Sequence, residues 1–199
     1  MKIIGLTGPT GAGKGSLCLE LEKSGFHCLD TDLVARQVVE KGKPCLLELC
    51  DFFGKGILLP DGNLDRKKLG AICFSDKEKL EVLNSITHKY ITKEVQLWLD
   101  GCRADGAFAA VIDAPLLFES GEDALCDMTV AVLADKQKRK ERIMSRDGIS
   151  DEEAERRMRN QKDDEFFEKS CDYVIYNNGK LDFRQEANKL SFILTDKNT

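Results

Sequence analysis

Residues 8–16 read Gly8-Pro9-Thr10-Gly11-Ala12-Gly13-Lys14-Gly15-Ser16, and the part that ends at Lys14 matches the pattern G-x-x-x-x-G-K. A short apolar run at residues 2–7 precedes this stretch, and a helical pattern over about 14–24 follows it. Glycine-rich turns between a strand and a helix bind phosphate, because backbone N–H groups converge there and the helix N-terminus carries partial positive charge. The stretch therefore predicts a phosphate loop, in which Lys14 binds the β- and γ-phosphates of a nucleotide.

The residue after the lysine departs from the usual pattern. Ser or Thr normally stands at this position and its hydroxyl binds Mg²⁺, whereas this chain has Gly15 followed by Ser16. Gly-Lys-Gly-Ser resembles the Gly-Lys-Gly-Thr loop of adenylate-kinase-like enzymes. We therefore expect Ser16 to contact a phosphate or the metal, and Mg²⁺ to keep more of its water ligands, which it gives up reluctantly.

Strand and helix signals alternate along the rest of the chain. Further strands are predicted at residues 26–29, 108–113, 128–133 and 173–176. Further helices are predicted over about 32–41, 44–53, 135–169 and 181–194. This alternation predicts an α/β fold, in which a parallel sheet is flanked by helices.

One part of the chain breaks the alternation. Residues 60–103 contain helical patterns and no strand signal, so we interpret them as a helical insertion in the α/β core. No repeat or low-complexity linker marks a domain boundary, and we therefore expect residues 1–199 to form a single unit.

Carboxylates follow two of the predicted strands. Asp30 and Asp32 come directly after the second strand, and Asp113 ends the third. Ligands of parallel α/β sheets bind beyond the carboxyl ends of the strands, and a kinase acting on a hydroxyl needs a carboxylate that accepts or orients its proton. Either Asp30 or Asp32 could instead cap the following helix. Asp32 is the stronger candidate for catalysis, and Asp113 resembles an acid on the Mg²⁺ side of the site.

The charged stretch 135–169 contains several arginines. Arg142 and Arg146 are four residues apart and therefore project from the same face of a helix. Such arginines could stabilise a transferring phosphoryl group when a lid closes. The alternative is a solvated face with ion pairs between neighbouring turns. We interpret 135–169 as a lid region and select these two arginines as site residues.

Composition limits the remaining classes of function. The 199 residues include 30 Lys and Arg against 35 Asp and Glu, which gives a net charge of -5 and disfavours non-specific binding to nucleic acid or anionic membranes. No apolar run approaches the ~20 residues of a membrane-spanning helix, and the N-terminus lacks a signal-peptide core. The eight cysteines show no Cys-x-x-Cys spacing. We therefore expect reduced thiols and a cytoplasmic protein. The sequence does not specify the oligomeric state.

Several motifs together resemble the dephospho-CoA kinase family, in the family's order and across nearly the whole chain. These motifs are the phosphate loop, Asp30-Thr31-Asp32 with Ala35-Arg36, Phe53-Gly54, residues 62–66 with Leu69, residues 83–88, Asp113-Ala114-Pro115-Leu116-Leu117-Phe118-Glu119, residues 142–147, Gln161, and Asp172 with Asn177-Asn178-Gly179. The chain departs from the family at Gly15, at Thr31, where Ala is frequent, and at Lys89, where Pro usually follows the histidine.

The resemblance implies ATP-dependent phosphorylation of the ribose 3′-hydroxyl of dephospho-CoA. It also implies a P-loop kinase core, a helical substrate-binding region, for which we take residues 60–103, and a lid. By position, Asp32 would be the catalytic carboxylate, Lys14 would bind phosphates and Arg142 would support the transition state. The residues implied to bind ATP are Gly8, Gly11, Ala12, Gly13, Lys14, Gly15, Ser16 and Arg146. Those implied to bind substrate are Arg36, Arg66 and His88, and those implied to bind Mg²⁺ are Asp113 and Ser16.

Two other functions remain as alternatives. A nucleoside monophosphate kinase or another small-molecule kinase would use the same Gly-Lys-Gly-Ser loop and lid. A non-enzymatic nucleotide switch is disfavoured, because a guanine-reading Asn-Lys-x-Asp motif is absent from the sequence.

Overall fold

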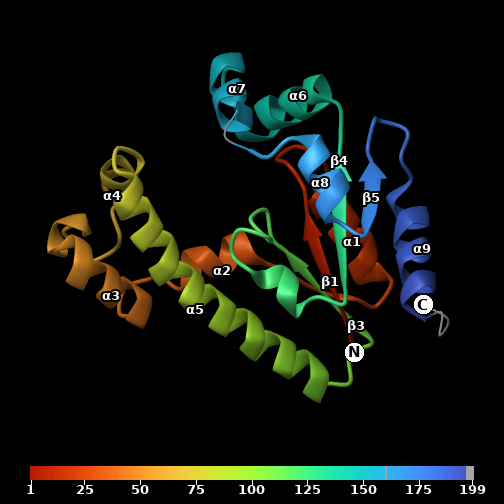
Figure 1. Cartoon of the computed structure of the whole chain (residues 1–199), viewed down its shortest axis with the longest axis horizontal. Coiled ribbons are helices and arrows are strands. Elements are labelled where there is room, and N and C mark those ends of the chain that lie inside the picture. Colours follow the sequence, from red (N-terminus) through yellow and green to blue (C-terminus); the bar gives the residue numbers. More distant parts are fainter. Residues whose placement is uncertain (160, 196–199) are drawn as a thin grey trace. The chain divides into compact units, whose positions relative to one another are not determined.

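A five-stranded sheet with the order β2-β3-β1-β4-β5 forms the centre of the fold (Figure 1). The computed structural model describes residues 1–159 and 161–195. The strands in that part of the chain are β1 (Lys2–Thr7), β2 (His27–Asp30), β3 (Ala109–Asp113), β4 (Met128–Leu133) and β5 (Tyr173–Tyr176). β1 is parallel to both β3 and β4, and β4 is parallel to β5. The predicted parallel α/β fold is thus confirmed.

The helices lie close to the positions predicted from the sequence. In the described residues they are α1 (Lys14–Lys23), α2 (Thr31–Gln37), α3 (Pro44–Phe53), α4 (Arg66–Phe74), α5 (Lys77–Ala104), α6 (Lys136–Asp147), α7 (Asp151–Arg159), α8 (Asp164–Ser170) and α9 (Phe183–Thr195), with short 3₁₀ turns η1 (Lys55–Ile57) and η2 (Glu122–Leu125). The charged stretch 135–169 therefore contains three helices. The first of them, α6, ends where Gly148 adopts a left-handed conformation.

One helix is shorter than predicted. The periodicity indicated a helix over about 32–41, but α2 ends at Gln37. Beyond it, the Glu40 N–H donates to the Gln37 carbonyl and the Lys43 N–H to the Glu40 carbonyl, which are bonds of successive turns. Gly42 then adopts a positive φ of 85°, which a helix does not continue through.

The chain divides into two compact units. One consists of Met1–Leu29 together with the chain from Gly101 onward, and the other consists of Asp30–Asp100. Residues 60–100 of the predicted insertion belong to the second unit, and residues 101–103 belong to the first. The boundaries chosen for the insertion and the lid stay predictions.

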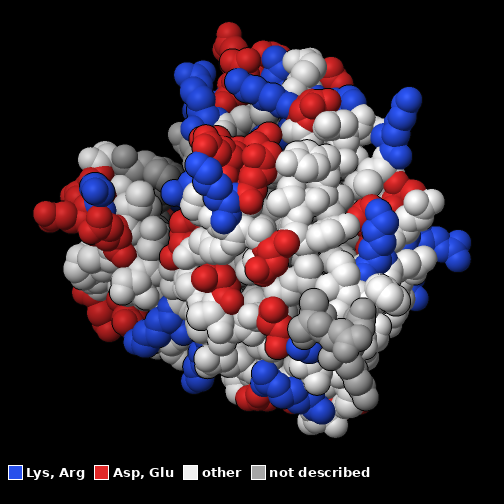
Figure 2. Space-filling model, turned by 45° about the vertical axis from the view of Figure 1, so that its right-hand side comes forward, with Lys and Arg blue, Asp and Glu red and all other residues white. Residues whose placement is uncertain are grey.

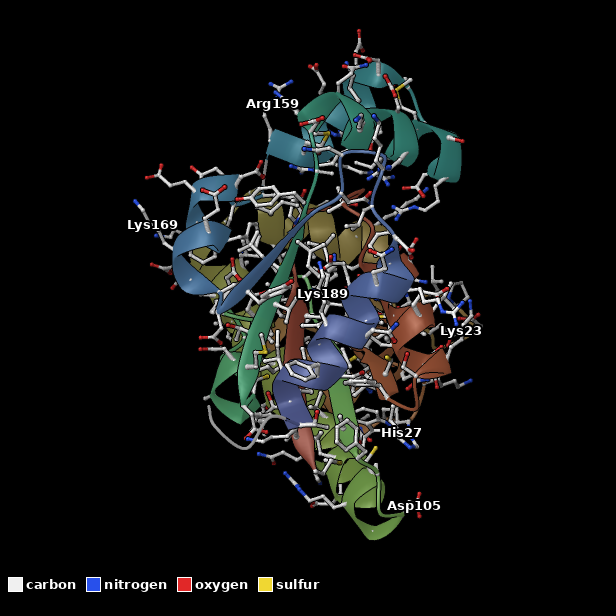
Figure 3. All side chains as sticks on the ribbon, turned by 90° about the vertical axis from the view of Figure 1, so that its right-hand side faces the viewer. Lys23, His27, Asp105, Arg159, Lys169 and Lys189 are labelled. Carbon is white, nitrogen blue, oxygen red and sulfur yellow. The ribbon has the colours of Figure 1, made fainter. Side chains whose placement is uncertain are left out.

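In the first unit, both faces of the sheet are covered. Ile4 and Leu6 of β1 face a core to which α1 and α9 contribute, and these two helices lie against one another (Figure 3). On the opposite face, Gly5 lies against Leu117 of the loop after β3, and Phe167 of α8 packs on β4. Strands buried on both faces consist of continuous apolar residues, which is why the sequence revealed them.

In the second unit, polar contacts join α3 and α5. The Glu48 carboxylate accepts hydrogen bonds from Lys89 at 2.8 Å and from the Tyr90 hydroxyl at 2.6 Å. The residues of α3 that are buried are Cys45, Leu46 and Leu49. Leu58 and Leu64 form an isolated antiparallel bridge on either side of residues 59–63.

Surface charge and thiols follow the composition. On the face drawn in Figure 2, basic and acidic side chains lie among one another. None of the helices described, in residues 1–159 and 161–195, is long and apolar enough to span a membrane. All eight cysteines are free thiols, and three of them, Cys45, Cys73 and Cys102, are buried.

Candidate functional site

The phosphate loop, residues 8–16, connects β1 to α1 and passes very close to neighbouring strands. Gly8 has a φ of 127°, and a Cβ there would lie 2.3 Å from the Val132 carbonyl oxygen of β4. Gly13 has a φ of 113°, and its Cβ would lie 2.5 Å from the Asn177 side-chain nitrogen. Only glycine combines these conformations with such close approach. The two glycines of the pattern G-x-x-x-x-G-K, Gly8 and Gly13, are therefore required by the conformation and packing of the loop.

The interior of the loop presents hydrogen-bond donors. Within the described part of the chain, the N–H groups of Gly11, Gly13, Lys14 and Gly15 donate to no other group. Lys14 begins α1, and its Nζ donates to the Gly8 carbonyl oxygen at 3.0 Å, across the loop. N–H groups that have no acceptor at a helix N-terminus, together with a nearby ammonium group, form an anion-binding site.

The outer side of the loop is fixed by Arg142 and Asn177. Arg142 Nη1 donates to the carbonyl oxygens of Gly11 at 3.1 Å and Ala12 at 3.2 Å. Asn177, which follows β5 and is 7% exposed, donates from Nδ2 to the Ala12 carbonyl at 2.7 Å. Its Oδ1 in turn accepts from Arg142 Nη2 at 3.3 Å. The arginine predicted for the site thus lies against the loop, and Asn177 is an additional residue that the sequence did not select.

Arg146, the other selected arginine, has a different partner. Its Nε and Nη2 donate to the two carboxylate oxygens of Asp147 at 2.7 and 3.0 Å, and its side chain is exposed. Arg157 Nη1 donates to the same carboxylate at 2.7 Å. These ion pairs match the alternative of a solvated helical face for Arg146.

Arg139 is a further loop contact, which the sequence reasoning did not select as a site residue. It is 7% exposed, and its Nε donates to the Thr10 carbonyl oxygen at 3.0 Å. Burial lowers the pKa of its guanidinium, and the Asp164 carboxylate opposes that shift. In the sequence it is one of many charged residues of 135–169, and no pattern distinguishes it from the exposed ones.

Asp113 ends β3 and lies beside α1. The Cys18 thiol donates to its Oδ2 at 3.7 Å. The pKa of Cys18 is raised, first by its hydrogen bond with Cys28, then by burial and by the negative charge of Asp113. Cys18 of α1 is therefore a neutral thiol, and it lies beside the Asp113 carboxyl group.

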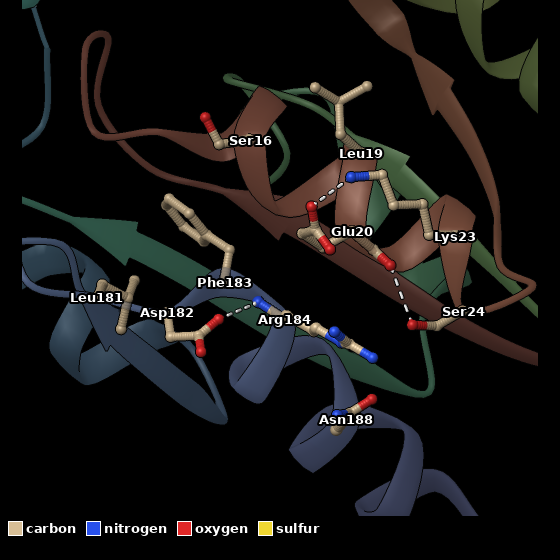
Figure 4. A pocket seen from close by; sticks show the side chains of 10 residues that line it. All are labelled: Ser16, Leu19, Glu20, Lys23, Ser24, Leu181, Asp182, Phe183, Arg184 and Asn188. Carbon is tan, nitrogen blue, oxygen red and sulfur yellow. Dashed lines mark hydrogen bonds and ion pairs between the residues drawn. The ribbon is translucent and has the colours of Figure 1, made fainter.

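A large hollow begins at Ser16, the last residue of the loop. It has a volume of about 1090 Å³ and lies between α1 and α9 (Figure 4). Its lining residues are Ser16, Leu19, Glu20, Lys23, Ser24, Leu181, Asp182, Phe183, Arg184 and Asn188. Space is also open at Gly15, where an added Cβ would meet nothing within 4 Å. The missing hydroxyl at position 15 therefore does not result from crowding.

The second unit contains Asp30, the last residue of β2, and Asp32 in the first turn of α2. Asp30 is the N-cap of α2, because its Oδ1 accepts from the N–H groups of Asp32 at 2.8 Å and Leu33 at 3.4 Å. The capping role left open for both acids thus belongs to Asp30. Asp32 is exposed in the first turn of α2.

The three residues predicted to bind substrate also lie in the second unit. Arg66 at the start of α4 donates from Nη2 to the Arg36 carbonyl oxygen at 3.3 Å, which brings these two arginines together. His88 is half-buried in α5.

Comparisons with known proteins agree with this geometry. A family model described as dephospho-CoA kinase matches residues 2–182. The dephospho-CoA kinase of Corynebacterium glutamicum is 42% identical over 188 residues, 94% of each chain. That of Oryza sativa is 37% identical and covers 94% of this chain and 81% of its own.

Solved structures give the same result. A structure from Thermus thermophilus is 31% identical, covers 96% of both chains and has a TM-score of 0.84. The dephospho-CoA kinase of Campylobacter jejuni is 28% identical, covers 100% of both chains and has a TM-score of 0.71. A shikimate kinase of Acinetobacter baumannii, 16% identical with a TM-score of 0.57, shares the fold. The chain belongs to the dephospho-CoA kinase family, whose members phosphorylate dephospho-CoA to CoA in the last step of CoA biosynthesis.

Proposed function

We propose that this chain transfers the γ-phosphoryl group of ATP to the ribose 3′-hydroxyl of dephospho-CoA. The observation that carries the proposal is the phosphate loop, with undonated N–H groups at Gly11, Gly13, Lys14 and Gly15 and with the Lys14 ammonium across it. Such a site stabilises charge on the phosphates during transfer. Membership of the dephospho-CoA kinase family supports the choice of acceptor.

Asp32 is the proposed catalytic carboxylate. Because Asp30 caps α2, the Asp32 side chain is not required for that cap. It would accept or orient the proton of the attacking 3′-hydroxyl, which makes the oxygen a better nucleophile toward the γ-phosphorus.

The basic residues have separate proposed roles. Lys14 would bind the β- and γ-phosphates, and Arg142, directly behind the loop, would support the charge that develops in the transition state. Arg146 would bind ATP after exchanging its present partner Asp147. Arg36, Arg66 and His88 would bind dephospho-CoA.

Mg²⁺ fits the donor set of this site. Asp113 offers a carboxylate and Ser16 a hydroxyl, and Mg²⁺ prefers oxygen ligands and retains water. We propose that these two residues hold the ion, directly or through water. When bound, it would neutralise charge on the phosphate oxygens.

The surroundings of the site complete the proposal. The nucleoside of ATP would extend from Ser16 into the hollow between α1 and α9. Residues 60–103 would bind the acceptor and 135–169 would close over the phosphates. We further propose that the protein acts in the cytoplasm and does not bind nucleic acid.

An acceptor panel tests the proposal. Purified protein is incubated with Mg²⁺-ATP and either dephospho-CoA, AMP, CMP or no acceptor, and ADP release is followed together with the mass of the product. We expect rapid ADP release with dephospho-CoA alone, and a product of the mass of CoA. Equal or faster turnover with AMP or CMP would establish the nucleoside monophosphate kinase instead. ATP binding without turnover of any acceptor would establish the nucleotide switch.

A further inference from the structure

Gln161, in the segment between α7 and α8, holds the middle of the phosphate loop. Its Oε1 accepts from the Thr10 N–H at 3.1 Å and from Arg139 Nη2 at 3.1 Å. Arg139 Nε donates at the same time to the Thr10 carbonyl oxygen at 3.0 Å. Both backbone polar groups of Thr10 are thus bound by side chains. We call Thr10, Arg139 and Gln161 the loop clasp.

The geometry of the loop clasp is narrowly defined because Arg139 is buried. A guanidinium removed from water needs hydrogen-bond acceptors in place of the lost solvent, and its planar group offers donors in fixed directions. Its described acceptors are the Thr10 carbonyl and Gln161 Oε1, with an Asp164 oxygen 3.7 Å from Nη1. A substitution that removes Gln161 Oε1 therefore deprives the Thr10 N–H and Arg139 Nη2 of the same acceptor.

Cationic side chains lie near the loop clasp. A hollow of about 300 Å³ is lined by Gly8 and Pro9 of the loop and by Arg159, Gln161 and Lys162. Arg159 is the last residue of α7, where Figure 3 labels it. Arg159 and Lys162 are thus neighbours of Gln161 in sequence and line the same hollow as the loop residues Gly8 and Pro9.

We propose that Gln161 is a positioning residue for phosphoryl transfer, which acts by holding the Thr10 backbone, both directly and through Arg139. Through Thr10 it keeps the neighbouring Gly11 N–H directed into the loop. It does not touch the nucleotide itself. This inference rests on the proposed function, since it concerns the efficiency of the same reaction.

Two variants of Gln161 and a matched control test the role. Gln161→Leu has a similar size but no acceptor, whereas Gln161→Glu keeps an acceptor at the same reach and adds a negative charge near the phosphates. Gln137→Leu makes the same chemical change on the exposed surface of α6, where Gln137 donates to Glu141. For each variant, kcat and the KM values for ATP and dephospho-CoA are measured well below its Tm.

The expected results separate positioning from simple structural support. Gln161→Leu should lower kcat about tenfold to a hundredfold, because small misplacements of reacting groups are costly, with little change in KM for dephospho-CoA. Gln161→Glu should keep kcat within about threefold of wild type but raise KM for ATP, less so at higher salt, because salt screens the added charge. Gln137→Leu should behave as wild type.

Hydrogen exchange of the wild-type protein tests the loop clasp independently of turnover. The Thr10 amide should exchange more slowly than that of Gly11, and Gln161→Leu should accelerate Thr10 exchange while leaving Leu6 in β1 unchanged. Equal exchange of Thr10 and Gly11 in the wild type would overturn the inference, even if Gln161→Leu does not fold. So would a wild-type kcat in Gln161→Leu, or equal kcat losses in both variants that follow their loss of Tm. If wild-type protein does not turn over dephospho-CoA, the proposed function fails and the exchange result alone decides the loop clasp.

Discussion

Asn177 Nδ2 lies 2.7 Å from the carbonyl oxygen of Ala12, and this buried hydrogen bond joins residues 165 positions apart. Ala12 belongs to the loop after the first strand of the sheet, and Asn177 follows the last one. The shape of the phosphate loop therefore depends on a side chain that follows β5, and not on the residues of the loop alone.

Asn177→Ala should weaken both folding and nucleotide binding. The variant leaves the Ala12 carbonyl without this donor and Arg142 without the Asn177 Oδ1 acceptor. We expect the free energy of unfolding to fall by about 1–3 kcal/mol, the usual cost of an unsatisfied buried polar group, and KM for ATP to rise. Urea denaturation and steady-state kinetics measure the two effects.

Asn178→Ala is the matched control for this prediction. Asn178 accepts from the Asp135 N–H at 2.9 Å and makes no described contact with the loop through its side chain. Its KM for ATP should stay at the wild-type value. A rise as large as that of Asn177→Ala would contradict a specific role for Asn177.

Substitution of Asp32 should lower activity, whereas substitution of Asp30 should lower stability. Asp32→Asn should reduce kcat by about 10²-fold or more, as for a lost proton acceptor, with little change in Tm. Asp30→Ala removes the cap of α2 and should lower the free energy of unfolding by about 1 kcal/mol. Kinetics and thermal unfolding of both variants provide the comparison. A loss of stability in Asp32→Asn with kcat unchanged would refute its catalytic role.

Gly15→Ser tests how the metal is held. The position is open, so the variant should fold with the Tm of wild type. If Mg²⁺ is bound through water and phosphates, the added hydroxyl should leave both kcat and its Mg²⁺ midpoint unchanged. Gly15→Ala, which adds the Cβ without the hydroxyl, serves as the control in the same Mg²⁺ titration. A clear gain in kcat for Gly15→Ser alone would show that the chain lacks a useful metal ligand.

Ser16→Ala addresses the hydroxyl that the chain does have. Ser16 lines the hollow next to the loop. Loss of one hydrogen bond to a charged phosphate should cost about 1–2 kcal/mol in nucleotide binding or transition-state support. Isothermal titration with ADP, alongside kcat/KM for ATP, measures this cost. Values equal to wild type in both would exclude a phosphate contact.

Glu122 should make stability depend on pH. It is 2% exposed, and its Oε1 has no hydrogen-bond partner among the described residues. Burial raises the pKa of its carboxyl, although a hydrogen bond from Ser120 opposes the shift. Above about pH 4.3 the unfolded chain loses this proton while the folded chain keeps it. The free energy of unfolding therefore falls as pH rises toward the folded pKa.

Glu122→Gln removes this titration. Its Tm relative to wild type should increase as pH rises from about 4.3 through that window. Glu94→Gln, at an exposed position of α5, is the control, and its Tm difference should not vary in this way. Thermal unfolding across the pH range provides the data, and a difference for Glu122→Gln that stays constant would refute the prediction.

Much of the first unit could be predicted from sequence because its signals are local. Apolar runs in β3 and β4 indicated buried parallel strands, and Gly8 to Lys14 indicated the phosphate loop. The end of α2 was wrong by several residues, since apolar Val38 and Val39 continue the helical pattern although the backbone already turns. Periodicity reports which side chains are buried, and turns can bury side chains as well.

The contacts around the loop were beyond the reach of the sequence. Arg139 and Gln161 bind Thr10 from more than a hundred positions away. Their hydrogen bonds depend on how α6 and the segment after α7 pack, and polar residues show no periodic pattern that indicates such packing. An arginine in a highly charged helix is usually solvated, and only the three-dimensional structure distinguishes Arg139 from its exposed neighbours.

The bond between Asn177 and Ala12 has a consequence for biosynthesis. A ribosome produces Ala12 of the phosphate loop 165 positions before it produces Asn177. A nascent chain that stops before β5 contains every residue of the nucleotide motif but lacks the side chain that closes its outer edge. Nucleotide therefore cannot assist folding of the early chain through a completed loop, and the site matures only after β5 and Asn177 have been synthesised.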